Sequence, residues 1–177
     1  MTPDAEAEVR ASYSAFRAQV SATIPITVLH IGPEQTAIAG GDGTQSPVTL
    51  ALDIGSKKTA RDYFQHIPPT PVEMENAIAG IEDQVMRVRT VVPKDPALFT
   101  TDAAVREIAL VAGVPDSAEM TLTLDAMEQT FERLVAVTLG KTALREGIPT
   151  GNEFAAALLI LREIMHHLQY QAITALR

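Results

Sequence analysis

The sequence predicts an α+β fold in which a small antiparallel β-meander of three or four strands packs with about six helices. Residues 48–54 alternate apolar and polar side chains, as half-buried strands do, and two short β-rich runs with glycine-containing turns precede them. Elsewhere, apolar residues recur every three or four positions, which is typical of amphipathic helices. We therefore expect one α+β domain over residues 1–177 whose C-terminal two-thirds is helical.

The N-terminal part combines one helix with the meander. Residues 3–22 are expected to form a helix that Thr2 caps and Pro3 begins. Its apolar stripe recurs at helical spacing and consists of Val9, Tyr13, Phe16 and Val20. The meander is expected over residues 25–54, with glycine-containing turns between its strands. Its apolar face needs a cover, and the flanking helices are the elements available to supply it.

Residues 56–177 are expected to be mainly helical. Helices are predicted at 57–65 with Ser56 as cap, from 71 to about 88, at 102–112, at 125–139 and from 151 to about 172. Three capping-box patterns mark helix starts, at 70–73, 125–128 and 150–153. Residues 90–101 are expected to form a loop, and the alternation at 120–124 predicts the fourth strand. A heptad-like stripe consists of Met74, Ile78, Ile81, Val85 and Val88.

The charge balance argues against nucleic acid and membrane partners. The chain has 14 Lys and Arg against 22 Asp and Glu, for a net charge of −8, and its basic residues are scattered. Binding to a duplex or to an anionic membrane depends on clustered cations. The acidic N-terminus does not resemble a signal peptide, and no apolar stretch is long enough to span a bilayer. We therefore expect a cytoplasmic protein, and the absence of cysteine is compatible with a reducing compartment.

Residues 40–44, Gly-Gly-Asp-Gly-Thr, are similar to the GGDGT motif of the NAD kinase and diacylglycerol kinase families. There the glycines let the backbone approach phosphates and the aspartate takes part in phosphoryl transfer, so the resemblance implies a phosphate site that includes Asp42. In those families the motif leads into a helix, whereas here a strand pattern follows at 48–52. A glycine-rich turn between two strands accounts for the same residues and is the interpretation we expect.

The transition from strand to helix after Asp53 is a candidate anion site. A helix N-terminus presents unpaired N–H groups and a partial positive charge. Two lysines in the first turn oppose that charge, and a docked anion would explain them. The predicted anion-binding residues are Gly55, Ser56, Lys57, Lys58 and Thr59. The alternative is a serine cap followed by two solvated lysines, and the spacing of a Walker A loop is absent.

The last helix carries a candidate metal or acid–base site at Glu163, His166 and His167. Glu163 and His166 have the Glu-x-x-His spacing of di-iron bundles, but no second copy of that motif exists in the sequence. The alternative is an ion pair between Glu163 and His167, which are four residues apart. His30 is expected inside a strand and His66 at a helix end, and either could contribute only if the fold brings the histidines together.

Three hypotheses for the function follow. The first, which the sequence favours, is a non-enzymatic module that self-associates, as a homodimer, and binds a partner or small ligand. Its support is the absence of any familiar catalytic motif, together with apolar surfaces at 74–88 and 154–172 that suit a two-fold interface. The second is an enzyme or sensor for an anionic or phosphorylated small molecule at residues 55–59. The third is a metal site on the last helix. The sequence defines no cofactor.

Overall fold

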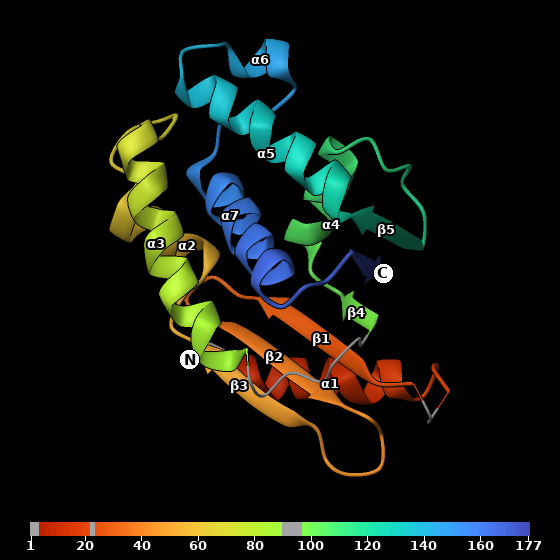
Figure 1. The fold of residues 1–177 in the computed structure, drawn as a ribbon. Helices are drawn as coiled ribbons and strands as arrows, with labels where there is room; N and C mark the ends of the chain where they lie inside the picture. The colour runs from red at the N-terminus through yellow and green to blue at the C-terminus, as the bar shows by residue number, and fades with distance from the viewer. Residues whose placement is uncertain (1–3, 22–23, 90–96) are drawn as a thin grey trace.

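A computed structural model describes residues 4–21, 24–89 and 97–177. Its centre is a six-stranded mixed sheet with the order β3-β2-β1-β4-β6-β5 (Figure 1). The strands are β1 (Ile26–Ile31), β2 (Thr36–Gly41), β3 (Val48–Leu52), β4 (Ala97–Thr100), β5 (Glu119–Thr123) and β6 (Ala172–Leu176). The predicted fold class, a small antiparallel meander with a helical C-terminal two-thirds, is therefore wrong. The chain has an α/β fold, and half of its sheet comes from the region that was expected to be mainly helical.

The two halves of the sheet differ in strand direction. β1 pairs with β2 and β2 with β3, both antiparallel, so the meander predicted at 25–54 is present as one half of the sheet. In the other half β4 runs parallel to β1, β6 runs parallel to β4, and β5 is antiparallel to β6. Parallel neighbours require long crossover connections. The helices between β1 and β4, and between β4 and β6, belong to these crossovers.

Two of the additional strands were not predicted, because one lies in an expected loop and the other was taken into the end of the last helix. β4 has four residues and lies in the stretch 90–101 that was expected to be a loop, of which 90–96 lie outside the described residues. β6 begins where the last helix was expected to end; in it, buried Ile173 and Ala175 alternate with partly exposed neighbours. β5 agrees with the predicted strand at 120–124 within one residue.

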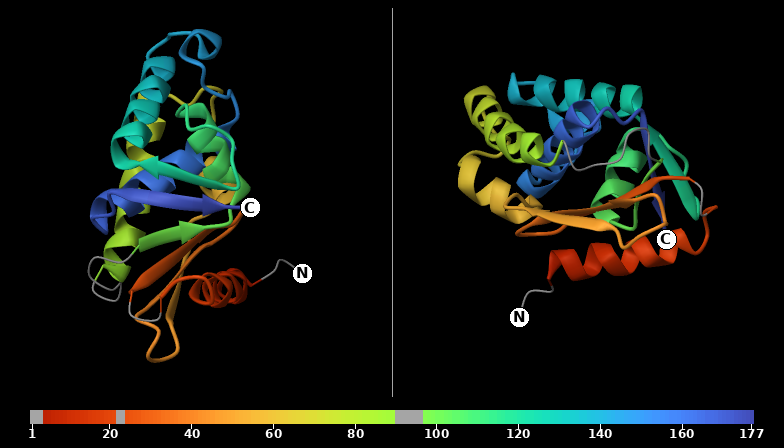
Figure 2. Two further views of the ribbon diagram at one scale, coloured as in Figure 1. Left: turned by 90° about the vertical axis from the view of Figure 1, so that its right-hand side faces the viewer. Right: turned by 60° about the horizontal axis from the view of Figure 1, so that its bottom comes forward.

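The helices cover the two faces of the sheet unequally (Figure 2). They are α1 (Ala5–Arg17), α2 (Ser56–Tyr63), α3 (Pro71–Val88), α4 (Ala103–Val111), α5 (Leu124–Thr138), α6 (Ala143–Glu146) and α7 (Asn152–His167). α1 packs on one face against β1, β2 and β3, while α7 lies on the other side among α2, α3, α4 and α5. Asp4 caps α1, which ends earlier than the predicted residue 22; Thr2 and Pro3 lie outside the described residues.

None of the helices formed by the described residues has the length and apolar character that a membrane crossing requires.

Side-chain alternation along β1 divides the core between the two faces. Ile26 and Val28 pack in the smaller cluster against α1, whereas Leu29 and Ile31 belong to the larger cluster that contains α7. Every residue of α7 from 154 to 161 is buried, as expected of a helix that is surrounded by other elements.

The apolar stripe of α3 is used within the chain. Met74, Ile81, Val85 and Val88 are all buried in the larger core, where α3 packs against α7 and α2. The surfaces at 74–88 and 154–172 that were expected to form a two-fold interface are thus largely occupied by intramolecular packing. These surfaces therefore no longer support the predicted homodimer.

One of the three predicted capping boxes forms. The side chain of Thr70 accepts from the N–H of Glu73, and the Glu73 carboxylate accepts from the N–H of Thr70 in return. α5 begins earlier than predicted, and Thr123 caps it instead of Asp125. α7 follows Gly151 and has no side-chain cap, so the box at 150–153 is not formed.

We expect Glu73 to make the stability of the folded protein depend on pH in the acid range. Its carboxylate accepts hydrogen bonds from His66 at 2.8 Å and from the N–H groups of Thr70 at 2.8 Å and Gln65 at 3.0 Å. These bonds, the one from His66 foremost, lower the pKa of Glu73 to about 2 from its ordinary 4.5. Because the pKa is lower in the folded chain, the contribution to stability is complete above pH 4.5 and is lost as the pH falls toward 2.

We therefore expect Glu73→Gln to be less stable than the wild type at pH 7, with a difference that shrinks as the pH falls from about 4.5 toward 2. Urea denaturation across this range measures the difference. A loss of stability of the same size at both ends of the range would contradict the assignment.

Candidate functional site

A cleft of about 530 Å³ opens where the turn between β1 and β2 meets the start of α1 and the start of α2. Its lining combines carboxylates with cationic side chains and comprises Asp4, Ala5, Glu8, His30, Gly32, Pro33, Glu34, Gln35, Asp53, Lys58 and Arg61. These residues come from three separate segments of the chain. The fold therefore assembles a site that no continuous motif encodes.

His30, near the end of β1, joins the sheet to α1 and to α4 through its two ring nitrogens. Its Nδ1 lies 2.7 Å from Oδ1 of Asp102, and its Nε2 lies 2.8 Å from Oε2 of Glu8. Asp102 precedes α4 without capping it; its Oδ2 instead accepts the N–H of Ile31 at 2.6 Å. The Asp102 carboxylate thus fixes the end of β1 and the side chain that enters the cleft from it.

The two partners of His30 favour its charged form. Only a ring protonated on both nitrogens can donate hydrogen bonds to Asp102 and Glu8 together. The hydrogen bond with Asp102 is the largest cause that raises the pKa of His30 above 6.5; attraction to both carboxylates adds to it, and burial opposes it. Both ring nitrogens of His30 are therefore engaged by carboxylates, which leaves no free nitrogen to act as a base.

The helix start predicted as an anion site is closed in part by the protein's own backbone. The N–H groups of residues 56–58 donate to the carbonyl oxygens of Gly32 and Pro33 at 2.9–3.0 Å. Gly55 permits this close approach, since a Cβ there would lie 2.6 Å from the Pro33 oxygen. An anion at this position therefore depends on side chains, because the N–H groups that were expected to bind it are occupied.

Among the five predicted anion-binding residues, all of which the structure describes, the cleft is lined by Lys58 alone. Its ammonium group lies 2.8 Å from Asp62 and 3.8 Å from Asp53. Lys57 is exposed and Thr59 is buried, and neither lines the cleft.

Arg61 is the cation that the sequence analysis missed. It lies three residues after Lys58 on α2, and its guanidinium nitrogens contact both carboxylate oxygens of Glu34 at 3.2 Å. The spacing of Lys58 and Arg61 places them on one face of a helix, and this spacing was the available signal. No sequence pattern could have placed Glu34, in the β1–β2 turn, opposite them.

The residues predicted as a metal or acid–base site on α7 pair with different partners. His166 contacts Glu128 of α5, whereas the Nε2 of His167 lies 3.2 Å from Glu163 and 3.6 Å from Glu82 of α3. Within residues 4–21, 24–89 and 97–177, no group of three or more His, Cys, Asp or Glu side chains is arranged to hold a metal ion. The described geometry gives the metal hypothesis no support.

Glu163 is instead the buried centre of an ion-pair network. It is 3% exposed and accepts a 2.6 Å hydrogen bond from Arg162 in addition to its contact with His167. The guanidinium of Arg162 also stacks 4.3 Å above the ring of Phe131 on α5. This is the predicted ion pair between residues four apart, extended so that it helps to join α7 to α5.

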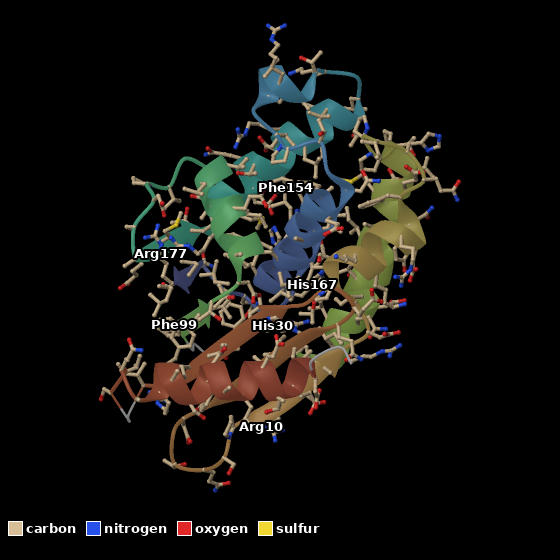
Figure 3. All side chains as sticks on the ribbon, turned by 180° about the vertical axis from the view of Figure 1, so that it is seen from behind. Arg10, His30, Phe99, Phe154, His167 and Arg177 are labelled. Atoms are coloured by element: carbon tan, nitrogen blue, oxygen red, sulfur yellow. The ribbon has the colours of Figure 1, made fainter. Side chains whose placement is uncertain are left out.

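Each of the four histidines pairs with a different carboxylate. Figure 3 shows His30 beside α1 and His167 at the end of α7. His66 pairs with Glu73 at the start of α3, so each histidine has its own carboxylate partner.

The segment at 40–44 is a turn between two strands. β2 ends at Gly41, and Asp42 accepts the N–H and the hydroxyl of Thr44 at 3.0 and 2.7 Å. Gly43 has a φ of 82°, a conformation that suits glycine. β3 follows where the kinase-type motif would lead into a helix, so the turn interpretation is confirmed.

The class of fold that these elements define, a mixed sheet between one helix and a helical layer, occurs in solved phosphatase structures. A PPX-GPPA enzyme of Aquifex aeolicus matches with a TM-score of 0.78 at 16% identity, over 96% of this chain and 59% of its own. A second structure, described as the Aquifex aeolicus member of the Ppx/GppA family, matches with 0.78 at 17% identity, over 99% and 58%. An exopolyphosphatase from Cytophaga hutchinsonii matches with 0.71 at 14% identity, over 97% and 58%.

At these identities the likeness is one of fold, and the chain spans about three-fifths of the length of the structures it matches. No protein-family model matches the sequence, and no curated protein does. The comparison nevertheless corrects the favoured hypothesis of a non-enzymatic, self-associating module, because the proteins that share the fold are described as enzymes. It agrees better with the second hypothesis, an enzyme or sensor for an anionic or phosphorylated small molecule.

Proposed function

We propose that this chain is a phosphatase-type domain that binds a phosphate-containing small molecule in the cleft beside the β1–β2 turn. The observation that carries the proposal is that Lys58 and Arg61 line one cleft in a fold shared with Ppx/GppA proteins. Of the residues predicted at 55–59, Lys58 keeps its proposed role as an anion partner.

The side chains of the cleft suit a phosphate group. A guanidinium group binds two oxygens of a phosphate at once, and an ammonium group acts as a point charge beside it. Arg61 and Lys58 supply one of each from α2, and the exposed Gln35 adds an amide donor from the turn. The ligand's phosphate would therefore face α2 and the turn, away from the carboxylates of α1.

The test is isothermal titration with inorganic pyrophosphate. We expect the double variant Lys58→Gln with Arg61→Gln to bind at least about ten-fold more weakly than the wild type, since it lacks both charged donors. The matched control is Lys141→Gln with Arg145→Gln, which makes the same change in net charge at the end of α5 and in α6. Equal affinities of the first variant and the wild type, or equal losses in both variants, would contradict the proposal.

An enzyme and a sensor are separated by the release of inorganic phosphate. Hydrolysis needs a group that accepts a proton from the attacking water, and the lining of the cleft includes the carboxylates Glu8 and Asp53. Phosphate released from tripolyphosphate by the wild type, and lost with the Lys58 and Arg61 changes, would indicate an enzyme. Binding without release would indicate a sensor. A homodimer and a cytoplasmic location stay predictions from the sequence.

A further inference from the structure

The guanidinium group of Arg61, which would bind a phosphate in the cleft, already contacts a carboxylate of the same chain. The two guanidinium–carboxylate contacts between Arg61 and Glu34 are each 3.2 Å long and form the paired geometry in which arginine also binds phosphate. Glu34 lies in the β1–β2 turn, and both side chains line the cleft. A phosphate that uses the guanidinium edge of Arg61 would therefore meet the Glu34 carboxylate in its place.

We propose that Glu34 acts as an internal competitor that holds Arg61 until a ligand binds, and that a ligand binds by replacing the Glu34 carboxylate with its phosphate. This inference rests on the proposed function, because it concerns how that same site is regulated. It requires no movement of the backbone, since Glu34 can turn toward the solvent. The contact is thus an autoinhibitory one that sets the affinity of the site.

The solvent exposure of the Arg61–Glu34 ion pair determines how much affinity a ligand loses to competition by Glu34. The side chains of Arg61 and Glu34 are 58% and 44% exposed, so the ion pair is well solvated and easily exchanged. Exposed pairs of this kind are weak. A ligand therefore loses only a few-fold in affinity to the competition. A buried ion pair at the same position would instead prevent the ligand from reaching Arg61.

Asp62 contacts both cations of the cleft, with its Oδ1 3.2 Å from Nε of Arg61 and its Oδ2 2.8 Å from Nζ of Lys58. Lys58 binds most closely to Asp62, four residues later on the same helix, and Asp62 does not line the cleft. This contact leaves the cleft side of Lys58 free of a carboxylate at hydrogen-bond distance, since Asp53 is 3.8 Å away. The competition is therefore concentrated at Arg61 and Glu34.

The test compares the affinity of Glu34→Gln and the wild type for inorganic pyrophosphate by isothermal titration. We expect Glu34→Gln to bind about two- to five-fold more tightly, because the amide competes poorly for the guanidinium group. The control is Glu107→Gln, an exposed glutamate of α4 that does not line the cleft and whose loss changes the net charge equally. Tighter binding by Glu34→Gln alone supports the inference.

The inference and the proposed function fail in distinguishable ways. Unchanged or weaker binding by Glu34→Gln would overturn the inference, as would equal gains in both glutamate variants, which would reflect net charge alone. If Glu34→Gln has no effect while Arg61→Gln abolishes binding, the proposed function stands and the competition does not. If Arg61→Gln binds pyrophosphate as the wild type does, both are overturned.

Discussion

Replacing Asp102 with alanine should lower the free energy of unfolding by about 3 kcal/mol, because it removes a buried carboxylate that serves two donors. The change leaves the Ile31 N–H without its 2.6 Å acceptor and His30 without its 2.7 Å partner. Both groups are largely shielded from water, so solvent replaces the lost hydrogen bonds only in part. Asp102→Asn, which keeps an acceptor for the N–H, should lose less. Urea denaturation at pH 6 measures both variants.

The pH dependence of the stability lost in Asp102→Ala isolates the contribution of the His30–Asp102 ion pair. The pKa of His30 is raised in the folded protein, so the pair contributes its full stability below about pH 6.5 and loses it as the pH rises through the folded-state pKa. The deficit of Asp102→Ala should therefore be larger at pH 6 than at pH 9. The His30 pKa, followed by NMR of the imidazole, should fall in the variant. An unchanged His30 pKa would contradict the described contact.

The second large effect is expected in α7. Leu161→Ala should cost about 2–5 kcal/mol of unfolding free energy, since Leu161 is fully buried in the larger core and truncation leaves a cavity. The matched control is Leu144→Ala in α6, where the same side chain is 94% exposed and the expected change is within about 0.5 kcal/mol. Similar losses in both variants, measured by urea denaturation, would contradict the central position of α7.

Local patterns predicted the local elements of this fold. The alternation at 48–54 located β3, and the capping box at Thr70 located the start of α3. β4 was missed because its four residues lie in a stretch that was expected to be a loop, and β6 because the helical stripe of the last helix was extended to about residue 172, where β6 begins. Their membership of the sheet depends on parallel pairing with strands distant in the sequence, such as Val28 with Phe99. That pairing turns an antiparallel meander into a mixed sheet, so the fold class depended on contacts that no local pattern carries.

Some features of the candidate site could likewise be predicted from the sequence, and others required the fold. Lys58 was predicted because it lies in the first turn of a helix that follows a strand, and its spacing to Arg61 could be read from the sequence. The contact between His30 and Asp102 joins residues 72 positions apart and required the fold. The sequence could not show that the carbonyls of the β1–β2 turn accept hydrogen bonds from the N–H groups at the start of α2, so an anion at 55–59 stays a prediction that depends on side chains.

The measurement that tests the central claim most directly is a titration of the ¹⁵N-labelled protein with inorganic pyrophosphate, followed by backbone amide NMR shifts. The account predicts saturable shifts at Gly32, Gln35, Lys58 and Arg61, which belong to the cleft lining. Shifts that are absent at these residues, or that saturate instead at the start of α7 or in α6, would contradict the placement of the phosphate site.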